Sequence, residues 1–251
     1  MTSDNSLKAG ERVDLLYPSR RQIIQSKKTF SYSVDAILLA HFARLPKSRH
    51  AKLLDLCAGN GAVTLLLADQ TSAKLVGVEV QEELVDMARR SANLNGLSDQ
   101  VDFLQADLVD YSQQVPAGSV DCLTCNPPYF KSSKTRQNKL AAYAQARHEV
   151  TLDLVSLLEA VSRLLKNGGL AYLVYRTDRL VELVDQALAF KLVPKQVRMV
   201  YPKVNKPSKL FLVKLIKEGS KAGFQMDSPF YIMDDKSKYT DQMIQVLKGN
   251  G

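Results

Sequence analysis

A tetrapeptide that could hold an amine, Asn126-Pro127-Pro128-Tyr129, follows the apolar run Val120–Cys125. Because proline fixes φ and lacks a backbone N–H, the groups left to face a ligand are acceptors: the Asn126 side-chain oxygen and the Pro127 carbonyl. Two fixed acceptors match the two hydrogens of one –NH2 group, and the Tyr129 ring can stack on a flat molecule. The motif therefore predicts a clamp for a planar exocyclic amine, placed where a strand ends.

A second group of residues could hold a nucleoside. Residues 55–61, Asp-Leu-Cys-Ala-Gly-Asn-Gly, join a strand-like run to a helical pattern. Glycines such as Gly59 and Gly61 let the backbone turn sharply and approach a ligand closely. Glu79 ends the next predicted strand, where a carboxylate can accept both hydroxyls of a ribose. Asp107, after the third predicted strand, is a candidate partner for an adenine amine.

The same turn helps to choose between two classes of cofactor. A dinucleotide-binding turn has a third glycine near position 64, where this chain has Thr64. Asp55 also disfavours a pyrophosphate, because the two charges repel each other. S-adenosylmethionine carries a positive sulfonium and a positive ammonium, so an acidic turn suits it, and we expect it to be the cofactor.

With this turn the chain resembles the class I S-adenosylmethionine-dependent methyltransferases, whose first motif is a glycine-rich turn with an acidic residue. The resemblance implies a set of cofactor-binding residues, namely Asp55, Cys57, Gly59, Gly61, Glu79, Asp107 and Asn126. Cys57 departs from the pattern, since it stands where the family usually has its first glycine. We therefore expect a less tight turn.

The clamp motif resembles that of the amino-methyltransferases, which methylate adenine N6, guanine N2 or the amide of glutamine. The resemblance implies that Asn126, Pro127 and Tyr129 are catalytic, and that Pro128, Tyr129 and Phe130 contact the target. The amine would attack the methyl group as its lone pair leaves conjugation. Because the proton leaves afterwards, no strong base is needed, and positioning supplies most of the rate.

Further segments narrow the resemblance. Residues 30–40, 146–149 (Ala-Arg-His-Glu), 229–232 (Pro-Phe-Tyr-Ile) and 239–240 resemble the tRNA-Val adenine-N6 methyltransferases and their Gram-positive relatives. The likeness extends over nearly the whole chain, from about residue 14 to residue 239. It implies that Asp35 closes over the methionine end of the cofactor, and that the target is adenine N6 beside the anticodon of tRNA-Val.

The charge distribution agrees with a polyanionic substrate. The formal net charge is +8, and residues 191–221 contain nine basic residues and one acid. Two further basic groups lie within residues 20–28 and 131–147. Because clustered Lys and Arg displace counterions from phosphates, we expect structured RNA as the partner. The candidate contacts are Lys131, Lys203, Lys206 and Lys209.

Three other functions remain open on the sequence alone. Glutamine-N5 methylation of a release factor and guanine-N2 methylation of ribosomal RNA would use the same clamp. The release-factor enzymes usually carry a longer helical N-terminal domain, and their protein substrate does not demand a strongly basic surface. The non-enzymatic alternative is an RNA-binding protein with a decayed methyltransferase fold, against which the intact motif argues.

Strands that alternate with helices must position these residues. Apolar runs at 53–56, 75–79, 101–104, 120–125 and 170–175 are separated by helical patterns at 62–68, 81–94 and 151–165. This alternation indicates right-handed βαβ units and a parallel sheet. A further helix is expected at 180–190. The runs 197–201 and 210–216 have no helix between them, which predicts an antiparallel hairpin at the sheet edge.

We therefore expect an α/β, Rossmann-like fold with a mostly parallel seven-stranded sheet and helices on both faces. Residues 1–48 are expected to form an N-terminal extension that packs on the core, with a helix over 34–45. Residues 49–220 would form the methyltransferase domain, and residues 221–251 a C-terminal tail with a short strand and a helix. Thr151 is the predicted cap of the helix at 151–165.

Composition restricts the remaining classes. The chain has no apolar run of about 18 residues and no secretory signal pattern, and its three cysteines are too few for a disulfide framework. We expect a cytoplasmic protein. Cys122 and Cys125 should point to opposite faces of a strand, and the three histidines do not cluster, so no metal site is expected. The sequence leaves the oligomeric state open, with a monomer favoured.

Overall fold

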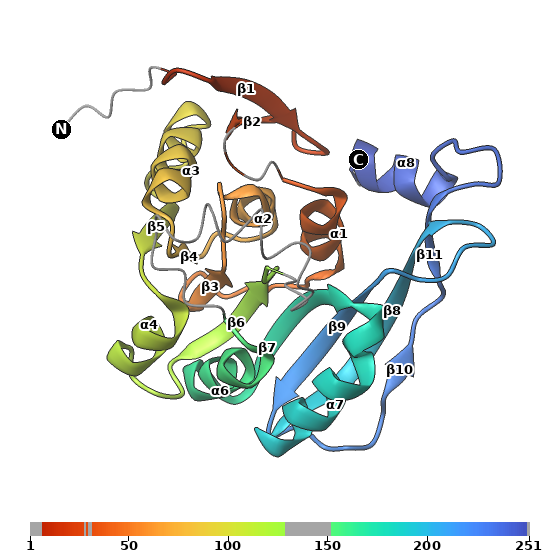
Figure 1. The fold of residues 1–251 in the computed structure, drawn as a ribbon. Helices are drawn as coiled ribbons and strands as arrows, with labels where there is room; N and C mark the ends of the chain where they lie inside the picture. The colour runs from red at the N-terminus through yellow and green to blue at the C-terminus, as the bar shows by residue number, and fades with distance from the viewer. Residues whose placement is uncertain (1–6, 28, 30–31, 129–151, 250–251) are drawn as a thin grey trace, which may run out of the picture.

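The computed structural model describes residues 7–27, 29, 32–128 and 152–249. Within them, a nine-stranded sheet with the order β10-β8-β9-β7-β6-β3-β4-β5 forms the centre of the molecule, and β11 pairs with β8 (Figure 1). Its strands are β3 (Leu53–Leu56), β4 (Leu75–Glu79), β5 (Val101–Gln105), β6 (Val120–Cys125), β7 (Leu165–Arg176), β8 (Leu192–Lys203), β9 (Leu210–Lys217), β10 (Gln225–Met226) and β11 (Phe230–Met233).

The sheet has a parallel core with an antiparallel edge. Strand β3 pairs in parallel with β4 and β6, β4 with β5, and β6 with β7. Strand β9 lies antiparallel between β7 and β8, which confirms the predicted hairpin. These seven strands have the predicted arrangement. The tail lengthens the sheet beyond the prediction, because β10 and β11 pair in parallel with β8.

Helices cover both faces of the sheet, as predicted. On one face lie α1 (Val34–Phe42), α2 (Ala62–Leu67), α3 (Glu82–Leu94) and, at the end of the chain, α8 (Asp241–Lys248). On the other face lie α4 (Leu108–Gln114), α6 (Leu154–Leu164) and α7 (Leu180–Ala189). Within the described residues, no helix is long and apolar enough to cross a bilayer.

Successive side chains of a strand enter opposite layers of the core. Tyr172 lies in the cluster under α1 and α2, whereas Leu173 lies in the cluster under α6 and α7. Cys122 and Cys125 divide in the same way, and both are fully buried. Their predicted role as core residues on opposite faces is confirmed.

Several helix boundaries differ from the prediction. Helix α1 ends at Phe42 rather than at residue 45. Helix α6 begins at Leu154, and its cap is Asp153, whose carboxylate accepts the backbone N–H of Ser156 at 2.9 Å. Thr151 lies outside the described residues. Helix α4 was not predicted, because its one clear signal is the capping residue Asp107, which the sequence also marks as a ligand candidate.

The N-terminal part forms a hairpin that the sequence did not reveal. Strands β1 (Glu11–Leu16) and β2 (Arg21–Ser26) pair antiparallel as a separate two-stranded sheet. Arg90 on α3 holds β1 through Glu11, with a nitrogen-to-oxygen distance of 2.6 Å and both side chains at most 6% exposed. Half of β1 is polar, its apolar residues Val13 and Leu15 are exposed, and Arg90, which anchors it, is remote in sequence.

Candidate active site

Three sequence motifs end adjacent parallel strands at the same edge of the sheet. Leu56 of β3 is in register with Val78 of β4 and with Cys125 of β6. The residues that follow, Cys57, Glu79 and Asn126, are therefore neighbours, since strands lie about 4.8 Å apart. The carboxyl edge of a parallel sheet is where α/β folds bind ligands. The structure thus brings the glycine turn, the acid of β4 and the clamp together.

The glycine turn keeps a tight path despite its cysteine. Cys57 adopts φ = 55°, the left-handed conformation that glycine takes easily, and Gly59 and Gly61 have φ of 57° and 88°. The backbone N–H of Gly61 donates to the Ala58 carbonyl at 2.9 Å. The expected loosening at Cys57 is wrong, because the residue accepts a conformation that costs about 1–2 kcal/mol and leaves the turn intact.

Asp55 lies beneath the turn, not at its surface. Its side chain is 1% exposed, and its two oxygens accept hydrogen bonds from the hydroxyls of Thr64 and Thr124 at 2.6 and 2.7 Å. Burial raises the pKa of Asp55 to about 6. The charge of Asp55 would therefore act on a ligand at the turn through space, without direct contact. Thr64, which stands in place of a dinucleotide-type glycine, is thus a partner of the acid.

Glu79 is anchored by the backbone of the site. Its Oε2 accepts the N–H of Gly59 and its Oε1 that of Gln81, both at 3.0 Å, and 7% of the residue is exposed. Burial raises the pKa of Glu79. Each carboxylate oxygen has further acceptor capacity, so the pair of oxygens can still accept two hydroxyl hydrogens.

Asp107 and Asp35 lie at the beginnings of helices, Asp107 as the cap of α4 and Asp35 in the first turn of α1. The Oδ1 of Asp107 accepts the N–H groups of Val109 and Asp110 at 2.8 and 3.2 Å, so it caps α4. Its other oxygen, Oδ2, takes no part in this cap. Asp35 is half-buried near the start of α1, and burial raises the pKa of its carboxyl. The structure shows no hydrogen bond between Asp35 and the turn.

The clamp is described only in part. Asn126 is half-buried, Pro127 is buried and Pro128 is exposed, directly after β6. Tyr129, Phe130 and Lys131 lie outside the described residues, as does the basic segment 131–147. The described geometry therefore places the amine-accepting half of the clamp beside the turn and Glu79.

Comparison with known proteins identifies the fold family. A family model described as a methyltransferase domain matches residues 47–218. The chain belongs to this family. The tRNA1(Val) (adenine(37)-N6)-methyltransferase of Shewanella sediminis is 28% identical over 228 residues, which are 86% of this chain and 90% of the relative. The enzyme of the same name from Porphyromonas gingivalis (strain W83) is 32% identical over 70% of this chain and 69% of its own.

A solved structure supports the fold. A predicted O-methyltransferase from Agrobacterium tumefaciens superposes with a TM-score of 0.65 at 21% identity, covering 84% of this chain and 94% of its own. At this identity the likeness bears on the fold alone. The Rossmann-like class I architecture and the resemblance to the tRNA-Val adenine-N6 methyltransferases are thereby confirmed.

One residue that holds the glycine turn was not among the predicted site residues. Asn60, inside the turn, is 5% exposed and donates from Nδ2 to the carbonyl of Ile24 at 3.0 Å. The N–H of Ile24 in turn donates to the Ser91 hydroxyl on α3 at 2.9 Å. Asn60 thereby joins strand β2 to the turn. Its position between two glycines was the available signal.

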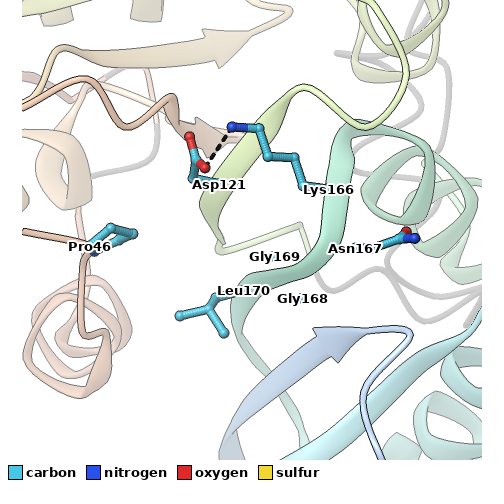
Figure 2. A pocket seen from close by; sticks show the side chains of 7 residues that line it. All are labelled: Pro46, Asp121, Lys166, Asn167, Gly168, Gly169 and Leu170. Atoms are coloured by element: carbon cyan, nitrogen blue, oxygen red, sulfur yellow. Dashed lines mark hydrogen bonds and ion pairs between the residues drawn. The ribbon is translucent and has the colours of Figure 1, made fainter. Parts of the chain in front are cut away.

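A cavity of about 260 Å³ lies at the opposite edge of the methyltransferase domain (Figure 2). It is lined by Pro46, Asp121, Lys166 and residues 167–170, and Asp121 and Lys166 form an ion pair at 2.7 Å. Asp121 lies near the start of β6, whereas Asn126 follows its end. The cavity is therefore separate from the carboxyl edge that carries the motifs.

Proposed function

We propose that this protein transfers the methyl group of S-adenosylmethionine to N6 of an adenine in tRNA, at the position named for its relatives, adenine 37 of tRNA1(Val). The observation that carries the proposal is the placement of Asn126 and Pro127 at the end of β6, beside the glycine turn and Glu79. Relatives with that activity in their names align over 86% of the chain, which supports the substrate.

The residues of the turn fit the cofactor. Glu79 offers two anchored oxygens to the ribose hydroxyls, and Asp107 keeps one oxygen for an adenine amine. Asp55 places negative charge below the turn, which favours a ligand with a sulfonium and an ammonium. Asp35 at the start of α1 is assigned to the methionine end. The bound cofactor supplies an electrophilic methyl group.

The clamp supplies position rather than acid–base chemistry. The Asn126 oxygen and the Pro127 carbonyl accept the two amine hydrogens, and this orients the nitrogen lone pair toward the methyl group. A nitrogen–carbon bond forms as the sulfur–carbon bond breaks, and the amine then loses a proton to water. Because the amine becomes more acidic as it gains positive charge, a strong base is unnecessary. Orientation of this kind can supply much of a rate enhancement.

The placement of charge favours RNA over a protein substrate. Among the basic residues of 191–221, two near the amino ends of the parallel strands have partners: Lys191 pairs with Glu218 at 3.4 Å, and Lys195 donates to the Ser220 carbonyl at 3.2 Å. Three lysines lie at the turn between β8 and β9, at the carboxyl end of β8: Lys203, Lys206 and Lys209. None of them forms an ion pair with any residue that the structure describes. These three lysines share an edge with Asn126, because β8 and β6 run in the same direction.

The deciding experiment is methylation of unmodified tRNA1(Val) by the purified protein with isotope-labelled S-adenosylmethionine, followed by nucleoside mass spectrometry. The expected product is labelled N6-methyladenine beside the anticodon. A transcript with guanine at that position is the matched control and should remain unlabelled there. Labelled N2-methylguanine in ribosomal RNA, or labelled glutamine in a release factor, would contradict the substrate while leaving the methyltransferase assignment intact.

A further inference from the structure

Two tyrosines lie in register on neighbouring strands at the open edge of the sheet. Tyr201 of β8 faces Tyr231 of β11, and their ring centroids are 5.0 Å apart with an angle of 32° between the planes. Both residues are half-buried, and neither belongs to a hydrophobic core cluster. Their strand neighbours Val200 and Phe230 are buried in the core on the opposite face. The pair therefore adds little to the core.

The tyrosine pair projects beyond the catalytic edge. Cys125 of β6 is level with Leu173 of β7, which is level with Val213 of β9 and, through it, with Val197 of β8. Asn126 is therefore level with residue 198 of β8. Tyr201 lies three residues beyond that level in the direction of the carboxyl edge, a distance of about 10 Å at 3.3 Å per residue. Across the sheet, three strand spacings separate them, or about 14 Å. A base held at Asn126 would not reach these rings.

The segment that begins at Tyr201 carries net positive charge, whereas the segment around Tyr231 is balanced. Residues 201–209 contain three lysines and no acid, and residues 230–240 contain two lysines and two acids. Lys203 follows Tyr201 on the same strand, and its ammonium donates to the Ser237 hydroxyl at 2.9 Å, with no carboxylate partner among the described residues. Asp234 is engaged by the backbone N–H groups of Lys236 and Lys238 at 2.9 Å. The surroundings are therefore suited to phosphate groups.

We propose that Tyr201 and Tyr231 form a stacking platform for an unpaired base of the substrate RNA other than the target adenine. The platform would hold a nucleotide near the target while flanking lysines contact its phosphates. This combination of aromatic rings and basic residues is how proteins hold single-stranded nucleic acid. Single-stranded loops expose such bases, and stacking on aromatic side chains is a common mode of RNA recognition. The inference rests on the proposed tRNA substrate.

The alternative is a purely structural role, in which the cross-strand aromatic pair only stabilises the edge of the sheet. Such pairs do contribute to stability. The two roles make different predictions. If the pair is structural, replacing the rings should lower the free energy of unfolding without changing how binding depends on any one base of the RNA. If the pair is a platform, replacing the rings should weaken RNA binding through the loss of contact with one particular base.

The test measures binding of the full chain to an unmodified anticodon stem-loop of valine tRNA. Tyr201→Leu and Tyr231→Leu should each weaken binding, and the expected loss is roughly 5- to 150-fold, as converted from the cost of losing one stacked base. Tyr201→Phe and Tyr231→Phe, which keep the rings, should bind like the parent protein. Cofactor affinity, measured by calorimetry, should be unchanged in all four variants.

A series of stem-loops with one abasic nucleotide each identifies the stacked base. At one position other than the target, removing the base should weaken binding by the parent protein but not by Tyr201→Leu, because two losses of the same contact are not additive. If the leucine variants bind like the parent, or lose affinity without such coupling, the platform is wrong while the methylation assay stands. If the parent protein neither binds nor methylates the RNA, both proposals are wrong.

Discussion

At the scale of single residues, the site depends on an amide that accepts hydrogen bonds. We predict that Asn126→Ala lowers turnover on tRNA by roughly a hundredfold or more, as expected for loss of one contact that is strongest in the transition state. Cofactor affinity should change little, because the anchors of the turn and Glu79 remain. Single-turnover methylation and calorimetry measure the two quantities. Full turnover in the variant would remove Asn126 from the catalytic role.

Asp55 gives the protein a distinctive dependence on pH. Its pKa is raised to about 6 by burial, so the folded state holds its proton more tightly than the unfolded state does. The stabilisation from protonation is complete below the unfolded pKa of about 3.9 and is lost as the pH rises through about 6, which amounts to roughly 2–3 kcal/mol. Urea unfolding should therefore show Asp55 lowering stability at pH 7.5 relative to pH 5.

The matched variant is Asp55→Asn, which can accept from one threonine hydroxyl and donate to the other. Its free energy of unfolding should depend less on pH than that of the parent between pH 4 and pH 7. Glu79, whose pKa is also raised by burial, contributes with the same sign in both proteins, so the difference between the two profiles reports Asp55 together with its electrostatic coupling to Glu79. Identical profiles would contradict the raised pKa.

At the scale of elements, the N-terminal hairpin is held by a largely buried ion pair. Breaking such a pair on one side leaves an uncompensated charge, so we predict that Arg90→Met destabilises the protein by about 3 kcal/mol. Glu11→Gln combined with Arg90→Met should recover part of that loss, since residue 11 is then uncharged and Asp86, the other carboxylate paired with Arg90, keeps its ion pair with Lys8 at 2.7 Å. Chemical denaturation gives both values. Equal stability of the parent and Arg90→Met would show that the hairpin does not depend on this contact.

The elements differ in how well the sequence predicts them. The strands β3, β4 and β6 are short, mostly apolar runs between turn residues, so their existence follows from local patterns. The hairpin of β1 and β2 does not follow, because β1 exposes its apolar residues Val13 and Leu15 and depends on Arg90, far along the chain. Tertiary contacts of that kind leave no periodic signal.

Site residues divide in a similar way. The positions of Asn126 and Glu79 at the carboxyl edge were predictable, because β6 and β4 are recognisable strands. The orientation of Asp55 was not, since it depends on Thr124, whose position opposite Asp55 arises only from strand pairing. Gly77 also escaped notice: a Cβ there would lie 2.4 Å from the Phe103 ring, yet nothing in its sequence context distinguishes it.

At the scale of the whole molecule, the net charge of +8 is unevenly available to a ligand. Lys191 and Lys195, near the amino ends of the parallel strands, already have partners within the protein. We predict that replacing Lys203, Lys206 and Lys209 with Gln flattens the dependence of log K on log salt for tRNA binding. The slope should fall by roughly 2 to 3, at about 0.7–0.9 for each neutralised phosphate.

The matched control replaces Lys191, Lys195 and Lys221 with Gln, which removes the same charge from the other end of the β8–β9 hairpin. If phosphates bind at the carboxyl edge, this control should keep nearly the full slope, and both triple variants should retain their affinity for S-adenosylmethionine. Equal flattening in the two variants would indicate that only net charge matters. An affinity independent of salt in the parent protein would argue against a polyanionic substrate, because release of condensed counterions is what gives RNA binding its salt dependence.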